Sequence, residues 1–80
     1  MPYISEEGKI TLRDIARKHR LSTYAIAAIA YVDASVVYHL EQGGPLPQKE
    51  VAQILRRLSE VTGQDYSIET VGGYWIEKEE

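Results

Sequence analysis

The sequence predicts an all-α domain, a compact arrangement of five helical segments with short extended segments at the N- and C-termini. Apolar residues recur at helical spacing along the chain. Capping residues precede four of the five helical stretches, and a glycine follows the longest stretch. Eighty residues suit one small domain, so we expect residues 1–80 to form a single unit with its core in 11–71.

The N-terminal part predicts two extended pieces and the first helix. Tyr3-Ile4 and Lys9-Ile10 flank a Glu-Glu-Gly turn. Thr11 with Asp14 three residues later matches a capping box, so we expect a helix to begin there and run to about His19. Its inward positions are Leu12, Ile15 and Ala16.

The stretch 21–43 predicts two short helices joined by a turn. The two helices and the turn together form a unit that covers residues 22–42. Ser22 caps the first helix and Asp33 the second, and the apolar pattern breaks between them at 31–33. The inward positions are Ile26, Ala27, Ala30, Val37 and Leu40. Two small helices across a short turn are the geometry that presents one of them to a DNA major groove.

The last third predicts a long helix over 47–62 and then a shorter, weaker element. Pro47 suits a first helical turn, and Gly63 is the expected left-handed stop. The apolar stripe consists of Val51, Ile54, Leu55, Leu58 and Val61. Arg56 and Arg57 lie outside this stripe, so we expect their side chains to be solvated. Ser67 can cap a single turn over 68–71, and residues 74–76 form a strand-like end.

Composition excludes several classes of site. The absence of cysteine removes disulfides and thiolate metal sites and suits a reducing cytoplasm, where we expect the protein. No apolar run approaches a membrane span, and the N-terminus has no signal core. The net charge is -3, but residues 9–20 hold five cations against one acid, whereas residues 64–80 hold five acids against one cation. Such a dipolar chain can bind phosphate on one face, although both segments can equally be solvated surfaces.

The central unit resembles the helix-turn-helix of the Cro/repressor-type (XRE) family of DNA-binding regulators. The resemblance covers roughly residues 11–71 and implies a lambda-repressor-like fold. It rests on a proline downstream of the unit, on the long helix ending at Thr62-Gly63, on Tyr66-Ser67-Ile68, and on Leu21-Ser22, Ala27, Val32, Val37, Leu40, Glu41 and Gly43.

The resemblance also implies residue roles. Base edges would be read from the start of the second helix of the unit, at Asp33, Ala34, Ser35, Tyr38 and His39. Phosphates would be bound by the start of the first helix, by the loop after the second and by the cations of the preceding helix, at Ser22, Thr23, Gln42, Arg17, Lys18 and Arg20.

The chain departs from the family pattern at three positions. Thr23 replaces the usual glutamine and reaches less far. Tyr31 stands where the turn usually has glycine, and left-handed backbone there would cost about 1–2 kcal/mol, so we expect an adjusted turn. The family pairs an arginine of its first helix with the glutamate that is Glu41 in this chain. The position of that arginine is occupied here by Ala16, which leaves Arg13 or Arg17 as possible partners of Glu41.

The side chains at the reading positions are short. Ala34 and Val36 can contact a thymine methyl group, Ser35 can bond to several bases, and His39 can donate to guanine. The alternative for Ser35 and His39 is an ordinary exposed position on a helix.

The aromatic residues indicate an interface. Six tyrosines and one tryptophan occur with no phenylalanine, and such residues suit surfaces that are buried part of the time. We expect a two-fold dimer contact at Tyr66, Tyr74, Trp75 and Ile76, with Tyr3-Ile4 or Ile10 pairing against 74–76. The alternative is that Trp75 folds back over the long helix within one chain.

These observations favour a sequence-specific regulator of double-stranded DNA that acts as a homodimer on a pseudo-palindromic site. The alternative is an antitoxin-like or other protein-interaction module that keeps the fold without reading an operator. We expect no enzyme, cofactor, metal or small-molecule substrate, because His19 and His39 lack partners at ligand or triad spacing and the glycine pairs lack a phosphate-loop context.

Overall fold

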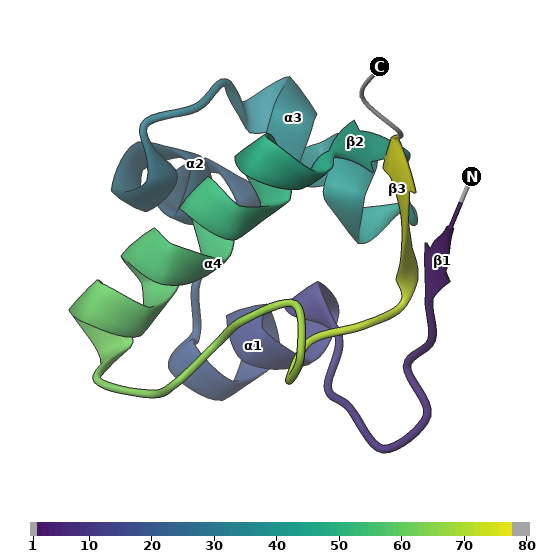
Figure 1. Ribbon diagram of the computed structural model, residues 1–80. Helices are drawn as coiled ribbons and strands as arrows, with labels where there is room; N and C mark the ends of the chain where they lie inside the picture. Colours follow the sequence, from purple (N-terminus) through teal and green to yellow (C-terminus); the bar gives the residue numbers. More distant parts are fainter. Residues whose placement is uncertain (1, 78–80) are drawn as a thin grey trace.

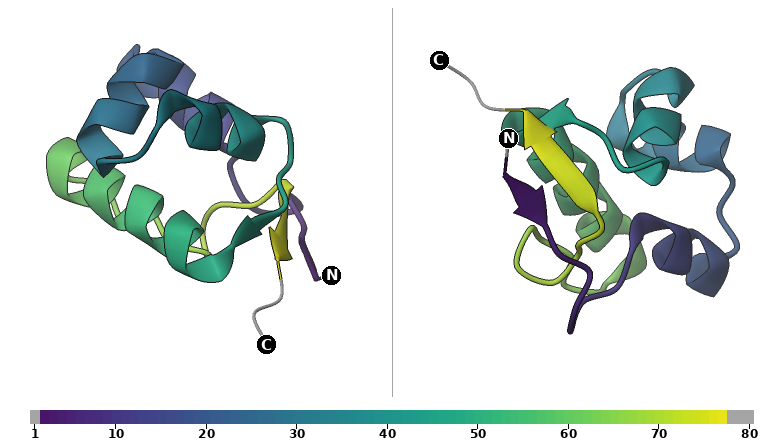
Figure 2. Two further views of the ribbon diagram at one scale, coloured as in Figure 1. Left: turned by 90° about the horizontal axis from the view of Figure 1, so that it is seen from above. Right: turned by 90° about the vertical axis from the view of Figure 1, so that its right-hand side faces the viewer.

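The chain folds into a cluster of helices with a small sheet along one side (Figure 1). The computed structural model describes residues 2–77, and within them there are four helices and three strands. The elements are β1 (Tyr3–Ile4), α1 (Leu12–His19), α2 (Thr23–Ala30), α3 (Ala34–Glu41), β2 (Leu46–Pro47), α4 (Gln48–Thr62) and β3 (Tyr74–Glu77). Figure 2 shows α2 next to α4, and β1 beside β3. The prediction of an all-α, five-helix domain is therefore wrong.

The three-stranded sheet is the first difference from the predicted all-α domain. Its strand order is β1-β3-β2, with β3 antiparallel to β1 and parallel to β2. Tyr3 pairs with Trp75, and Leu46 pairs with Ile76. The extended pieces at both ends were predicted, but their pairing within one chain was not. Pro47 was expected inside the first helical turn, and it instead ends an edge strand, where its missing N–H breaks no ladder.

The expected fifth helical segment, a single helical turn over 68–71, forms a hydrogen-bonded turn and not a helix. The N–H groups of Thr70 and Val71 both donate to the Ser67 carbonyl, at 3.0 and 2.9 Å, and no helix follows in the described residues. Val71 instead forms a parallel bridge with Ile10, and the Gly72 N–H donates to the Ile10 carbonyl at 2.9 Å. The backbone groups that would have continued a helix are thus used to join the two ends of the chain.

The predicted helix starts are confirmed. The Thr11 hydroxyl accepts from the Asp14 N–H at 3.2 Å while the Asp14 carboxylate accepts from the Thr11 N–H at 3.0 Å, a complete capping box. Ser22 and Asp33 cap α2 and α3 as expected, and Gly63 ends α4 with φ 75°. Local chemistry therefore sets where the helices begin.

Helix α4 lies at the centre of the core, against α2. The expected stripe residues Val51, Ile54, Leu55 and Leu58 are all buried, but Val61 is 56% exposed, so its assignment to the core is wrong. A rotation of about 100° per residue puts Val61 about 80° from Val51 around the helix axis, at the edge of the stripe.

Three residues expected at a dimer surface belong to this core. Tyr66, Tyr74 and Ile76 are 6%, 1% and 5% exposed, and the Tyr66 hydroxyl lies 2.7 Å from His19 Nε2. Strand β3 alternates, so Tyr74 and Ile76 point inward while Trp75 points outward. Trp75 packs on Tyr3 of the same chain, with ring centroids 4.8 Å apart, and not on α4. Only Trp75 of the four remains on the surface.

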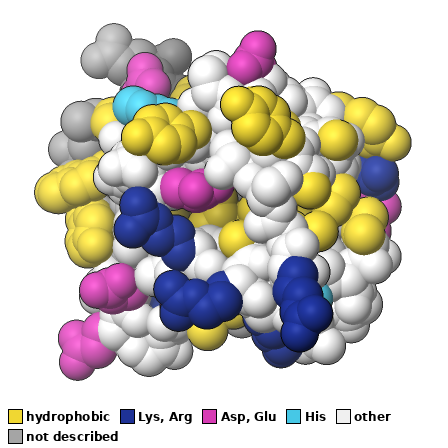
Figure 3. Space-filling model, turned by 180° about the vertical axis from the view of Figure 1, so that it is seen from behind, with side chains coloured by type: hydrophobic (Ala, Val, Ile, Leu, Met, Phe, Trp, Pro, Cys, Tyr) yellow, Lys and Arg dark blue, Asp and Glu magenta, His cyan; other side chains and the backbone are white. Residues whose placement is uncertain are grey.

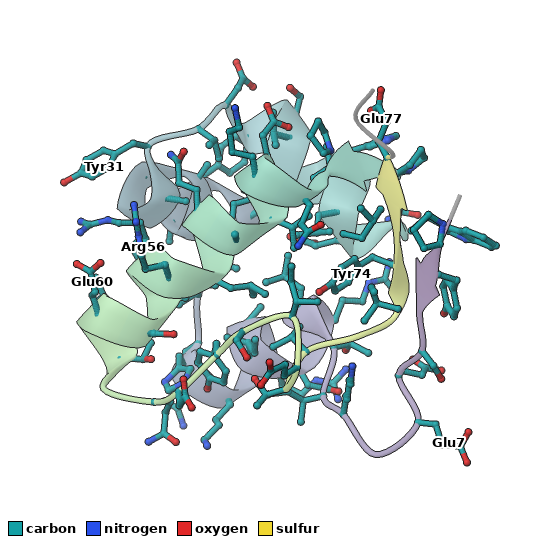
Figure 4. The ribbon with its side chains drawn as sticks, viewed as in Figure 1. Glu7, Tyr31, Arg56, Glu60, Tyr74 and Glu77 are labelled. Carbon is teal, nitrogen blue, oxygen red and sulfur yellow. The ribbon has the colours of Figure 1, made fainter. Side chains whose placement is uncertain are left out.

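Tyr74 carries a buried hydroxyl that has no hydrogen-bond partner among the described residues, and Figure 4 shows its ring pointing from β3 into the core. Burial raises the pKa of Tyr74 to about 12. We expect Tyr74→Phe to stabilise the fold by about 1 kcal/mol in urea unfolding, because it removes an unpaired polar group. Above pH 10 the unfolded chain ionises this tyrosine and the folded chain does not, so stability falls between pH 10 and 12, and the variant loses less of it.

The matched control is Tyr24→Phe, because the Tyr24 side chain is 78% exposed and its hydroxyl is already solvated. If Tyr74→Phe lowers the free energy of unfolding by about 1 kcal/mol or more, the expectation is contradicted, and the Tyr74 hydroxyl makes a stabilising hydrogen bond.

Candidate nucleic-acid interface

Helices α2 and α3 form a bent pair of two eight-residue helices. No single helix in residues 2–77 is long and apolar enough to cross a membrane, and although α2 and α3 pass that test together, the chain bends by 118° at the break between them. A bend of about 90–120° is what a helix-turn-helix requires. The geometry matches the predicted unit over 22–42.

The turn between these helices keeps left-handed backbone at a bulky residue. Tyr31 has φ 58° and ψ 41°, so the expected adjustment of the turn does not occur. Arg57 of α4 offsets the strain: its Nε donates to the Ile29 carbonyl at 3.1 Å, and its guanidinium lies 4.7 Å from the Tyr31 ring centroid. Gln53 adds a bond to the Ala30 carbonyl at 2.8 Å. The prediction that Arg57 is merely solvated is wrong, because it caps the end of α2.

In Figure 4 Tyr31 lies at the outer end of α2, on the same side of the molecule as Arg56 and Glu60 of α4. Arg56 and Glu60 are 3.9 Å apart and both well exposed, so this ion pair contributes little to stability.

The start of α2 was expected to bind phosphate through two hydroxyl groups. Ser22 accepts from the Ala25 N–H at 3.0 Å, which leaves its hydroxyl proton available. Thr23 donates its proton to Glu41 Oε1 at 2.8 Å, so that proton is not free for a phosphate. Within residues 2–77 the side-chain partner of Glu41 is Thr23, and neither Arg13 nor Arg17 forms an ion pair with it there. This bond ties the first residue of α2 to the last of α3.

The start of α3 is fixed by Asp33. Its carboxylate accepts from the Ser35 N–H at 2.9 Å, and this backbone hydrogen bond holds the pKa of Asp33 below its ordinary value. A depressed pKa means that the cap is fully formed above the ordinary carboxyl range and is lost only as the pH falls through the lowered value. The carboxylate therefore serves its own helix and is not a free reader of bases.

The exposed side of α3 holds most of the expected reading residues. Ser35, Tyr38 and His39 are exposed, as is Gln42 at its end, and Ala34 is half-buried. Val36, like Ala34, is half-buried and packs against the core, which leaves only part of its side chain for the expected contact with a thymine methyl group.

A groove of about 450 Å³ lies between the first turn of α2 and the part of α3 that runs from its cap to Tyr38. It is lined by Thr23, Tyr24, Asp33, Ala34, Ser35 and Tyr38. Tyr24 was not among the predicted site residues. The signal that could have identified it is an aromatic residue in the first turn of α2, outside the inward positions of that helix.

Helix α1 supplies the positive charge. Arg13, Arg17, Lys18 and Arg20 are all exposed, and the ion pairs found within residues 2–77 involve only Arg56 and Arg57. Figure 3, the face opposite to Figure 1, shows Lys and Arg side chains gathered over its lower half and hydrophobic side chains above them.

Two of these cations approach α3. Arg13 and Arg17 line a hollow of about 360 Å³ together with the acids Glu6, Asp14 and Glu41, so these two cations of α1 lie next to the C-terminal end of α3 but share the hollow with three carboxylates. Lys9 is not part of this surface, because its ammonium donates to the Ile68 carbonyl at 3.2 Å.

Among the described residues, no group of three or more His, Cys, Asp or Glu side chains could hold a metal ion. Comparison of the chain with models of protein families, with curated proteins and with solved structures finds no match.

Proposed function

We propose that this chain is a small transcriptional regulator that binds double-stranded DNA sequence-specifically, with α3 in the major groove and α1 beside the phosphate backbone. The observation that carries the proposal is the junction of two surfaces: the exposed side of α3 and the cations of α1 that have no ion pair within residues 2–77. An eight-residue helix is about 12 Å long, close to the width of the major groove.

The expected contacts divide into two kinds. Arg17, Lys18 and Arg20 neutralise phosphates, with the Ser22 hydroxyl and Gln42 adding bonds to the backbone. Ser35, Tyr38 and His39 face the bases. Thr23 acts through Glu41, by holding α2 against α3, and contributes less to phosphate binding than the family pattern implies.

One such helix gives modest affinity, so the proposal includes a homodimer whose two α3 helices read half-sites about 34 Å apart on a pseudo-palindrome. Trp75 and Tyr3 are the exposed aromatic pair with which a second copy could pack. A reducing, cytoplasmic location suits a DNA regulator without cysteine.

The experiment is a fluorescence anisotropy titration against duplexes selected from a randomised pool, at several salt concentrations. We expect enrichment of one sequence and an affinity that falls linearly on a log–log plot of binding constant against salt. Arg17→Ala should lower the slope by about 1 and weaken binding to all sequences alike, because it removes one phosphate contact.

The matched control is Arg56→Ala. Arg56 carries the same charge and its side chain is 74% exposed, but it lies on α4 and pairs with Glu60. Its removal should leave the salt slope unchanged. If no duplex is enriched at low salt, or if both arginine variants behave alike, DNA binding by this surface is ruled out.

A protein-interaction module, antitoxin-like or otherwise, is the second candidate. The observation that favours it is the set of large aromatic side chains left exposed, which is Tyr3, Tyr24, Tyr31, Tyr38 and Trp75. Binding of a protein partner that survives Arg17→Ala, with no enriched duplex, would select this candidate.

A further inference from the structure

We infer that the groove between Tyr24 and Tyr38 reads the C5-methyl groups of pyrimidines in the major groove of DNA. This inference rests on the proposed function and names the chemical feature that α3 recognises. The two tyrosine side chains come from different helices, are 78% and 58% exposed, and line the same groove.

The lining of the groove excludes the usual polar readers. Its six residues include no arginine, lysine, glutamine or asparagine, which are the side chains that make paired hydrogen bonds to a base edge. The carboxylate of Asp33 is bonded to the Ser35 N–H, and the Thr23 hydroxyl is bonded to Glu41. The polar groups left in the groove are the Ser35 hydroxyl, the hydroxyl groups of the two tyrosines and the second carboxylate oxygen of Asp33, and none of them makes the paired hydrogen bonds that identify a base edge. Most of the exposed surface of the groove is apolar, which suits an apolar feature of the base.

The apolar surfaces that remain are the two aromatic rings and the Ala34 methyl group. In the major groove the apolar feature that distinguishes one base from another is the C5-methyl group of thymine. Methylation of cytosine at C5 puts a methyl group in the same place. Thymine and 5-methylcytosine therefore share the chemistry that fits the groove.

Charge complementarity identifies the occupant as DNA. The groove adjoins α3, and α3 adjoins the exposed cations of α1, so the surface has a mainly aromatic centre, whose one carboxylate, Asp33, caps α3, and a positive flank. A DNA duplex has the complementary arrangement, with phosphates along the rim and methyl groups on the floor of the groove. An apolar protein partner would match the centre and leave the cations without a counterpart.

The test compares duplexes that differ by single methyl groups. From a selected duplex, each thymine is replaced in turn by uracil, which deletes only the methyl group, and each cytosine by 5-methylcytosine, which adds one. We expect at least one thymine whose replacement weakens binding about fourfold, the value for one buried methyl group. A cytosine facing the groove should gain a similar factor on methylation, and the two arms distinguish the two sources of the methyl group.

Variants assign the effect to the groove. Tyr24→Ala and Tyr38→Ala should each reduce the thymine-to-uracil ratio towards 1 at the sensitive position. Tyr31→Asn is the matched control, because Tyr31 is an exposed tyrosine at the other end of α2 and asparagine tolerates its left-handed backbone. The thymine-to-uracil ratio of the Tyr31→Asn variant should stay at the wild-type value.

The outcomes separate the two proposals. If a duplex is enriched but uracil and thymine bind equally at every position, and methylated and plain cytosine do too, methyl reading is overturned while DNA binding stands. If the ratio persists in both tyrosine variants, the groove is not the reader and the inference is overturned. If no duplex is enriched, DNA binding fails and methyl reading fails with it.

Discussion

Gly72→Ala is expected to destabilise the fold by about 3 kcal/mol or more, which would lower the melting temperature by about 12–24 °C. A methyl group at this position would lie 2.0 Å from the Ser5 carbonyl oxygen and 2.7 Å from the Ser5 carbonyl carbon, both backbone atoms that cannot rotate away. The clash would separate the segment after β1 from the segment before β3. Thermal unfolding followed by circular dichroism measures the change.

Gly63→Ala is the control that separates backbone strain from collision. Gly63 has φ 75° but open space around its added methyl group, so the cost there is the strain alone, about 1–2 kcal/mol. A Gly72 variant that melts within a few degrees of the wild type would show that the close approach to Ser5 is not present in solution.

Ile54→Ala is expected to cost about 2–5 kcal/mol, the range for truncating a buried isoleucine. Ile54 is fully buried in the middle of α4, where the helix packs against α2, so the lost methyl groups leave a cavity with no route to solvent. Urea unfolding should show a lower midpoint with an unchanged slope, because the fold is retained.

Val61→Ala on the same helix is the matched control. Its side chain is 56% exposed, so truncation should change stability by less than about 0.5 kcal/mol. Equal losses at Ile54 and Val61 would mean that the two residues are buried alike, as the apolar spacing alone suggested.

The parts of the fold that the sequence predicts are those decided by neighbouring residues. Thr11, Ser22 and Asp33 cap helices because each hydroxyl or carboxylate reaches an N–H two or three residues away. The pairing of Tyr3-Ile4 with 74–76 was expected between two chains and occurs within one, and the strand at Leu46-Pro47 was missed, because each pairing joins residues far apart in the sequence and nothing local specifies the partner strand.

The same distinction applies to the candidate interface. The exposure of Ser35, Tyr38 and His39 was predictable from their place outside the apolar stripe of one helix. The bond between Thr23 and Glu41 and the contact of Arg57 with Tyr31 were not, because each joins side chains of two different elements. The groove depends in addition on the bend between α2 and α3, which no single segment encodes.

The pairing of β1 with β3 bears on how this protein folds during synthesis. The helices α1 to α4 precede Tyr74 and Ile76, whose side chains are part of the core that those helices enclose. A growing chain can therefore form its helices early, but their inner surface stays open to water until residues 74–77 have left the ribosome. Until then α2 and α3 have their local structure without the full core beneath them, and the pairing of β3 completes that core.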